Sequence, residues 1–487
     1  MHELSKQFRS GLVLTLLFCA VLEPIRLSAS GLNLPMLGDT SSGIVSQQQE
    51  YLIGRSWLKA FRSRIQEFDD PVLQEYTEQL LYNLATYSDL EDPRLELVLV
   101  DNPTMNAFAV PGGVIGIHTG IFNYAKTEDQ LASVLAHELA HLSQRHFARG
   151  IEEQRKSSTL TMGGLLAGLV IAATVGGDAG TAALSVTQAA AMDGRLRYTR
   201  SNEQEADRIG LQTLRGAGRN PSAAAEMFEI MLVATRHSGS RPPEFLLTHP
   251  VTERRIADTR SRTISAPLRH YPHKRKYQLM RARALVGLTQ NPKSSIRHFE
   301  HLLSKDEHNN EAERYGLVLA LIADNRLKVA RTQLNKLIQA NPQELVFRHT
   351  DVELDIQQQK LEDASTKIDD LLTANPNNYP LTLLRSEVSW QAKHYQKASE
   401  TLKLLSRQRP NDPNIWYRLA EVRGLAGDIS GVHLARAEYF VLVGAFRLAR
   451  KHLALAASLV STDFKQSAII RQRLRELVAV EEQVVKL

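Results

Sequence analysis

The strongest constraint on the fold is a 34-residue period in the C-terminal half of the chain. A dipeptide that ends in proline recurs at this interval, at Asn341-Pro342, Asn375-Pro376 and Arg409-Pro410. Small and apolar residues recur with the same period, at Ala330, Ala364 and Ala398 and at Leu303, Leu337, Leu371 and Leu405. Because proline ends a helix and alanine lets two helices approach closely, each period predicts a pair of packed helices. Roughly four such pairs fit between residues 275 and 425.

This pattern resembles the tetratricopeptide repeat, which has the same period. We predict an α-solenoid of such repeats over residues 266–487, in which the tail from Val432 to Leu487 adds a degenerate repeat and capping helices. Stacked helix pairs present a concave surface that could recruit a protein partner or client. The alternative is a helical scaffold that shields an active site elsewhere in the chain.

A pentapeptide in the N-terminal half, His-Glu-Leu-Ala-His at residues 137–141, predicts a metal site. Thr127, followed by acidic residues and a glutamine, marks a capped helix start, and leucine and valine then recur at helical spacing. His137 and His141 therefore project from one face of a helix, one turn apart, as two ligands of a tetrahedral Zn²⁺ must. Glu138 lies about 100° round that helix, where its carboxylate can act as the general base on a metal-bound water.

A catalytic zinc needs a third protein ligand and one open position. His146 lies about 140° from the ligand face of the helix, so we expect it to support a ligand from behind or to lie on the surface. The third ligand is expected from a second helix, on which Glu203 and Asp207 share a face and Glu205 points elsewhere. Glu203 could bind the metal, and Asp207 could orient a ligand imidazole or hydrogen-bond the reacting group. The alternative is an acidic, solvated helix start.

These motifs together resemble those of peptidase family M48, in which His-Glu-x-x-His is followed further along the chain by Glu-x-x-Ala-Asp. The second motif is present at residues 203–207, and residues 106–113 match another segment of the family, Asn-Ala-Phe-Ala-x-Pro-Gly-Gly. The resemblance covers roughly residues 45–265. It implies one zinc ion per chain and these site residues: ligands His137, His141 and Glu203, general base Glu138, and proton donor Asp207.

His249 lies in the loop sequence Leu-Thr-His-Pro-Val. In exported members of the family, a histidine in this context can fill the fourth zinc position and keep the enzyme inactive. The resemblance therefore implies a switch, in which His249 binds the metal at rest and withdraws when a client engages. An ordinary loop histidine is the alternative.

Two strand-like segments, residues 95–100 and 113–118, precede the expected metal-binding helix, and Pro111-Gly112-Gly113 predicts a turn between them. We expect a hairpin whose open edge can bind an extended peptide by β-augmentation. His118, in the second segment, is expected to be packed or exposed and not a ligand.

The N-terminus has the features of a Sec signal peptide over residues 1–30, with basic residues, a short uncharged run and small residues before a cleavage site after Ser30. Cleavage would remove Cys19, the only cysteine, so the mature protein would contain neither a disulfide nor a thiolate ligand. We expect a periplasmic protein, with an uncleaved N-terminal anchor as the alternative.

Residues 157–177 and 179–192, between the two halves of the expected metal site, carry no charge. We expect two helices that pack beside the active site or rest on a membrane surface. Because the first segment is long enough to span a bilayer, a membrane crossing is the alternative.

The predicted fold class is α+β and mostly α-helical, with a metallopeptidase domain at residues 31–265 that holds a small β-sheet, followed by the solenoid. A formal net charge of +6 is too small to indicate nucleic-acid binding. The architecture resembles that of periplasmic M48 peptidases with tetratricopeptide repeats. This resemblance implies degradation of misfolded outer-membrane β-barrel proteins, assistance in their assembly, and contact with the β-barrel assembly machinery and the lipopolysaccharide-export barrel. A chaperone-like adaptor with silent proteolysis and an inner-membrane-anchored peptidase are the alternatives.

Overall fold

The computed structural model describes residues 45–157, 200–237, 244–264, 274–305, 311–460 and 463–486, which all belong to one compact unit spanning Gly43–Leu487. The predicted signal peptide and the uncharged segments, apart from Ser157, lie outside these residues. Within the described ranges, no helix is both long enough and apolar enough to cross a membrane.

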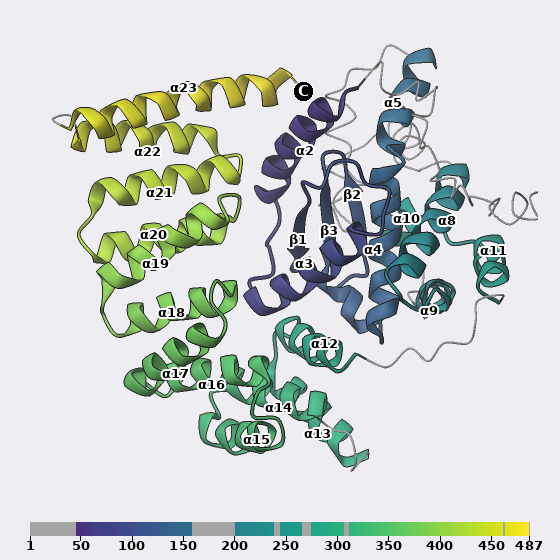
Figure 1. Cartoon of the computed structure of the whole chain (residues 1–487), viewed down its shortest axis with the longest axis horizontal. Helices are drawn as coiled ribbons and strands as arrows, with labels where there is room; N and C mark the ends of the chain where they lie inside the picture. The colour runs from purple at the N-terminus through teal and green to yellow at the C-terminus, as the bar shows by residue number, and fades with distance from the viewer. Residues whose placement is uncertain are drawn as a thin grey trace, which may run out of the picture. The chain divides into compact units, whose positions relative to one another are not determined.

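Three strands form a sheet in the N-terminal half (Figure 1): β1 (Glu96–Val100), β2 (Ala107–Val110) and β3 (Val114–His118), in the order β1-β3-β2. β3 pairs in parallel with β1 and antiparallel with β2. The predicted hairpin between residues 95–100 and 113–118 is therefore wrong, because these segments form the parallel pair and β2 is the hairpin partner of β3. β2 has only four residues, of which two are alanines with low strand propensity, so its sequence gives a weak strand signal.

Helices cover both faces of this sheet. They are α2 (Gln47–Arg62), α3 (Pro71–Ala85) and α4 (Glu128–Ser143). Leu97 and Leu99 of β1 join the core formed with α3 and α4, whereas Val98 and Val100 join a second core formed with α2. The strand is thus buried on both faces, as its continuous apolar sequence requires.

The remaining helices of the N-terminal half follow α4 in the chain. They are α5 (His146–Ser157), α8 (Arg200–Gly216), α9 (Ser222–His237), α10 (Glu244–Thr248) and α11 (Glu253–Ile264). α4 packs against α8, α9, α3 and β2, and every residue from Gln130 to His141 is buried. The predicted start of α4 is confirmed, since Thr127 and Gln130 form a capping box.

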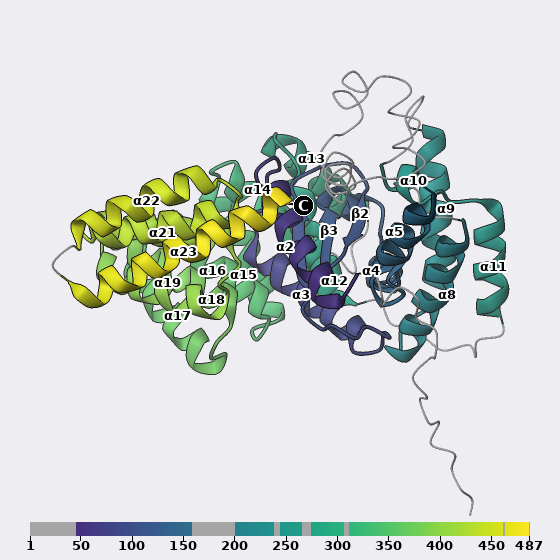
Figure 2. The same ribbon diagram turned by 90° about the horizontal axis from the view of Figure 1, so that it is seen from above.

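The C-terminal half is a stack of helices in which each packs on the next (Figures 1 and 2). They are α12 (Arg275–Gly287), α13 (Pro292–Lys305), α14 (Glu311–Ala323), α15 (Leu327–Ala340), α16 (Leu345–Gln357), α17 (Leu361–Ala374), α18 (Tyr379–Gln391), α19 (Tyr395–Gln408), α20 (Pro413–Leu425), α21 (Ile429–Leu442), α22 (Phe446–Leu459) and α23 (Phe464–Lys486). The recurrent Ala330, Ala364 and Ala398 are fully buried. The predicted mostly helical fold with a small sheet and a helical repeat array is confirmed.

The first helices of the array share the core of the N-terminal half, whereas the later helices have cores of their own. Tyr277 of α12 is fully buried, and its hydroxyl donates to the carbonyl oxygen of Ala125 at 2.7 Å. The domain boundary that we predict near residue 265 is therefore not a break in the packing.

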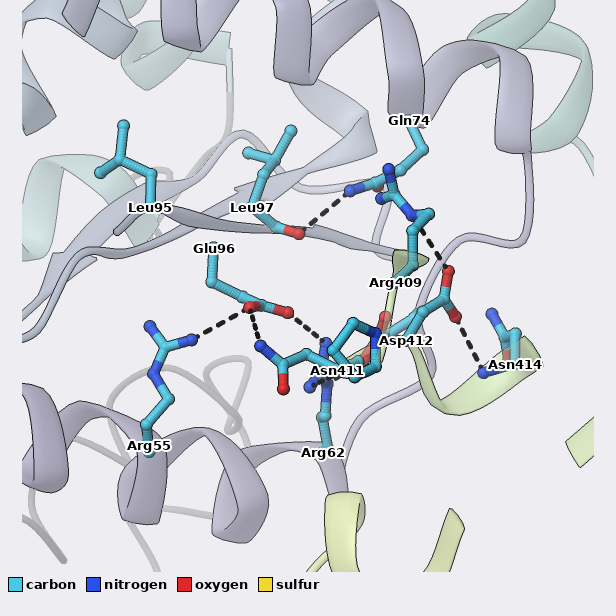
Figure 3. A network of polar contacts seen from close by, with 12 residues as sticks. Arg55, Arg62, Gln74, Leu95, Glu96, Leu97, Arg409, Asn411, Asp412 and Asn414 are labelled. Carbon is cyan, nitrogen blue, oxygen red and sulfur yellow. Dashed lines mark hydrogen bonds and ion pairs between the residues drawn. The ribbon is translucent and has the colours of Figure 1, made fainter. Parts of the chain in front are cut away.

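The later helices contact the N-terminal half through polar groups (Figure 3). Arg62 Nη1 donates to the carbonyl oxygen of Asn411 at 3.1 Å, and Asn411 Nδ2 donates to Glu96 Oε2 at 3.2 Å. Arg409 Nη1 donates to Glu78 Oε2 on α3 at 2.9 Å. We call this set of five residues the polar seam.

Candidate metal centre

Four side chains that the sequence singled out lie together: His137, His141, Glu203 and His249. All four are buried, and their ligand atoms lie within 4.8 Å of one another. α4 contributes the first two from consecutive turns, α8 contributes Glu203, and His249 follows directly after α10. Elements that are far apart in the sequence therefore converge on one point.

The spacing of the donor atoms suits a tetrahedral ion. With bonds of about 2.0–2.2 Å, the corners of such a tetrahedron lie about 3.3–3.6 Å apart. His137 Nε2 is 3.0 Å from His141 Nε2 and 3.4 Å from His249 Nδ1. Glu203 Oε1 is 3.4 Å from His141 Nε2 and 3.0 Å from His249 Nδ1. The four residues thus fit a zinc-like metal ion.

Small residues let α8 approach α4 closely enough for Glu203 to reach this cluster. Ala206 is fully buried, and a methyl group placed on Gly210 would lie 3.3 Å from the carbonyl of Ala136 on α4. Both residues follow Glu203 at helical spacing and so lie on the side of α8 that faces α4. The close packing of the two helices therefore brings the carboxylate to the histidines.

Asp207 supports His137 from behind. Its Oδ1 lies 3.1 Å from His137 Nδ1, the ring nitrogen that faces away from the other donor atoms. Arg255 of α11 donates to both Asp207 oxygens, at 2.6 and 2.7 Å, and lies 2.8 Å from Glu203 Oε2. This geometry favours the orientation of a ligand imidazole by Asp207 over the role of proton donor that the family resemblance implies.

The electrostatics of the cluster favour a cation. Burial alone would raise the pKa of Asp207, but hydrogen bonds and the charge of Arg255 outweigh it and hold that pKa below its usual value. Burial alone would lower the pKa of His137, but hydrogen bonds to Asp207 and Glu203 raise it to about 10. Carboxylates thus stabilise positive charge at this point.

Glu138 lies beside the donor atoms. It is fully buried, and its Oε1 lies 3.7 Å from His249 Nε2. Burial raises the pKa of its carboxyl, an effect that nearby histidines and the backbone N–H of Ala109 oppose. Burial therefore raises the proton affinity of a carboxylate that lies beside the donor cluster.

The edge of β2 that faces away from β3 and pairs with no other strand among the described residues borders the centre. The N–H of His118 donates to the carbonyl oxygen of Asn106, and backbone groups alternate in direction along a strand. The N–H and C=O groups of Ala107 and Ala109 therefore point away from β3. Ala109 and His141 both line one cleft. The cleft thus connects this edge of the sheet with the donor cluster.

α10 holds His249 over the centre. The backbone N–H of His249 donates to the carbonyl oxygen of Phe245 at 2.8 Å, and the two rings stack with centroids 4.7 Å apart. Both side chains are buried. His249 is thus packed among the donor atoms, and it is not a histidine on an exposed loop.

The other two histidines considered from the sequence lie outside the donor cluster. His118 is buried, and its Nδ1 lies 2.9 Å from Thr104 Oγ1, so it is packed. His146 is also buried and contacts His141 from behind, which settles the choice between support and surface exposure.

Arg255 was not anticipated from the sequence. In its helix it shares a face with Ile256, Thr259 and Thr263, which are all buried. A charged residue on a buried helix face needs a partner of opposite charge, and this pattern was the available signal.

Comparison with known proteins agrees with this architecture. The model of peptidase family M48 matches residues 71–263, and a tetratricopeptide-repeat model matches residues 355–422. The fold and the site thus define a metallopeptidase with a helical repeat array, and the predicted resemblance and enzyme class are confirmed.

Relatives that match nearly the whole chain show to which family of metallopeptidases it belongs. The chain is 31% identical to the beta-barrel assembly-enhancing protease of Escherichia coli over 481 residues, which cover 98% of both chains. It is 32% identical to the putative beta-barrel assembly-enhancing protease of Vibrio cholerae, over 99% of this chain and 100% of that one. The mitochondrial metalloendopeptidase OMA1 of Schizosaccharomyces pombe is 32% identical over 40% of this chain and 57% of its own length. The chain therefore belongs to the beta-barrel assembly-enhancing protease family.

Proposed function

We propose that this metallopeptidase is a zinc-dependent endopeptidase of the periplasm that degrades misfolded or stalled outer-membrane β-barrel proteins and assists their assembly. The observation that carries the zinc assignment is the convergence of four buried donor atoms beside Glu138, with separations of 3.0 and 3.4 Å between neighbouring donors. Imidazole and carboxylate donors without a thiolate suit zinc. The substrate class rests on the relatives, which are named for enhancing β-barrel assembly. The location rests on the predicted signal peptide.

The roles of the residues follow from their positions. A bound zinc ion would lower the pKa of a water molecule and polarise the scissile carbonyl. The Glu138 carboxylate accepts the proton of the attacking water and returns it to the leaving amine, because it lies next to the donor atoms and burial raises its proton affinity. Asp207 remains a carboxylate and orients His137, since Arg255 lowers its pKa.

The cleft along the outer edge of β2 is the proposed substrate platform. A β-barrel protein stalled in assembly exposes unpaired strand edges. Such a strand can lie along the cleft that Ala109 and His141 both line, beside this edge of the sheet. Selection for an unpaired strand would spare proteins that have completed their barrels.

We propose that His249 occupies the fourth ligand position of the resting enzyme. Its Nδ1 lies 3.0 Å from Glu203 Oε1 and 3.4 Å from His137 Nε2, as the fourth corner requires. Substrate would gain access when α10 and His249 withdraw. We further propose that the repeat array contacts the β-barrel assembly machinery and the lipopolysaccharide-export barrel. Separately, we propose that the uncharged segments contact a membrane surface.

The deciding experiment measures metal content and degradation of an unfolded outer-membrane barrel protein by the wild type, Glu138→Gln and His249→Ala. We expect about one zinc ion per chain in each. Loss of the base should reduce hydrolysis by about 10²–10⁴-fold with metal retained. His249→Ala should raise basal hydrolysis several-fold, because it opens the fourth position.

Other outcomes would contradict specific parts of the proposal. Zinc binding without degradation in any of the three proteins would favour an adaptor in which proteolysis is silent. Absence of stoichiometric zinc from the wild type would refute the metal assignment. Unchanged basal hydrolysis in His249→Ala would refute the switch alone.

A further inference from the structure

The turn between α4 and α5 places His146 against His141, one of the proposed metal ligands. Arg145 has a φ of 50°, in the left-handed region that side chains rarely adopt, and it separates α4 from α5. His146, the next residue, is only 1% exposed. Its Nδ1 lies 2.8 Å from His141 Nδ1. The strained turn thus places one imidazole directly behind another.

The hydrogen positions in this pair follow from the role of His141. A histidine that offers Nε2 to a metal carries its ring hydrogen on Nδ1. His141 Nδ1–H therefore donates to His146 Nδ1, which must present a lone pair. The hydrogen of His146 then lies on Nε2, which is 3.1 Å from Glu205 Oε2. One neutral tautomer of each ring satisfies both contacts, and the chain of donors ends on a carboxylate.

Glu205 is fixed at the far end of this chain. Arg149, one turn beyond His146 on α5, donates from Nη1 to Glu205 Oε2 at 3.0 Å. Glu205 follows Glu203 by two residues on α8, so the helix that supplies the third ligand also anchors the second one. His137 has Asp207 in direct contact, whereas His141 reaches its carboxylate through an intervening imidazole.

We infer that His146 is a positioning residue for the metal ligand His141, and that Glu205 fixes the tautomer of His146. The inference rests on the proposed metal-binding function and names residues that the motifs leave out. Groups that hold the outer nitrogen of a ligand histidine typically contribute about 10–100-fold to metal affinity. His146 should therefore affect how tightly the metal is held without touching the substrate.

The test measures zinc affinity of the full chain by chelator competition, together with the visible absorption of the Co²⁺-substituted protein. His146→Leu removes the acceptor at similar volume and should weaken zinc binding by about 10–100-fold. It should also shift the Co²⁺ bands, because His141 is free to turn. His146→Asn keeps an acceptor oxygen near the Nδ1 position and should restore most of the affinity.

A matched control separates positioning from packing. His118→Leu replaces a second buried histidine whose Nδ1 contacts Thr104 and not a ligand, so its zinc affinity should equal that of the wild type. KM for a peptide should be unchanged in His146→Leu at saturating zinc. Equal affinities of wild type and folded His146→Leu, or no recovery in His146→Asn, would overturn the inference. A wild type that binds no zinc would instead overturn the proposed function and this inference with it.

Discussion

Arg255 shows how single residues stabilise the metal centre. Its guanidinium is buried and contacts Asp207 and Glu203, two carboxylates that burial would otherwise make costly. Removing one partner of a buried charge cluster leaves the others uncompensated, at a cost of roughly 3–5 kcal/mol. Arg255 is thus an integral part of the centre, although it donates no atom to the metal.

We expect Arg255→Leu to lower the melting temperature of the metal-free protein markedly, in line with that cost. Arg208→Leu is the matched control, since Arg208 also pairs with an aspartate, Asp258, but is 47% exposed. Exposed pairs contribute only about 0–1 kcal/mol, so the control should melt close to the wild type. Similar melting of the two variants would show that Arg255 does not compensate buried charge.

The buried side chain of His118 makes the stability of the protein depend on pH. Burial lowers the pKa of His118 from 6.5 to about 4. Between these values the unfolded chain binds a proton that the folded chain does not, so this contribution to stability is present above pH 6.5 and is lost as the pH falls towards 4. The loss amounts to about 3 kcal/mol at most.

Replacing His118 removes this effect. We expect the difference in melting temperature between wild type and His118→Leu to shift in favour of the variant as the pH falls from 6.5 to 4. The comparison of the two proteins cancels the titration of all other groups. Parallel pH profiles would contradict the prediction and show that folded His118 takes up its proton as the unfolded chain does.

At the scale of elements, α2 packs on the β2–β3 turn through a glycine. A methyl group on Gly54 would lie 2.0 Å from the carbonyl oxygen of Pro111, which no real contact allows. Gly54→Ala must therefore push α2 away from the turn, and overpacking of this kind costs about 1–3 kcal/mol.

A second helical glycine supplies the control for this packing. No atom of the described residues lies within 4 Å of a methyl group placed on Gly150 of α5, so Gly150→Ala should stabilise the helix by about 0.5–1 kcal/mol. Thermal unfolding should thus shift in opposite directions for the two alanine variants. A neutral Gly54→Ala would mean that α2 can move without cost.

Local signals account for what could be predicted at this scale. The start of α4 could be predicted from its capping residue Thr127. The repeat helices could be predicted because the 34-residue period recurs several times, as at the buried Ala364. The pairing of β1 with β3 could not be predicted, because it depends on β2, a short strand with little propensity of its own. His137 and His141 were predicted as ligands from spacing, and His249 only from the family resemblance. The role of Arg255 could not be predicted, because it depends on contacts between distant helices.

At the scale of the whole molecule, the array is attached to the N-terminal half in two different ways. Its first helices share the apolar core, in which Tyr277 and Tyr315 are fully buried. Its later helices meet α2, α3 and β1 through the polar seam. Salt does not weaken apolar burial, whereas it screens partly exposed ion pairs. The later helices should therefore separate from the N-terminal half more readily than the first ones.

Replacing Arg409 tests whether the polar seam holds the later helices against the N-terminal half. Arg436, which has similar local contacts, serves as the control. Arg409 pairs with Glu78 across the seam, lies 4.2 Å from the ring of Tyr379 and is 27% exposed. Arg436 pairs with Glu421 within the array, lies 4.3 Å from the ring of Tyr417 and is 23% exposed. The two arginines make similar local contacts and differ in whether those contacts cross the seam.

We expect Arg409→Gln to speed amide hydrogen exchange in α3 and β1 as well as in the turn at residues 409–413, and 1 M salt to do the same in the wild type. Arg436→Gln should speed exchange only within α20 and α21. Exchange in α12 should stay slow in both variants, because α12 shares the apolar core of the N-terminal half and its ion pair with Asp70, made by Arg283, is largely buried. Faster exchange in α3 and β1 from both variants alike, or from neither, would show that the polar seam does not hold the later helices in place.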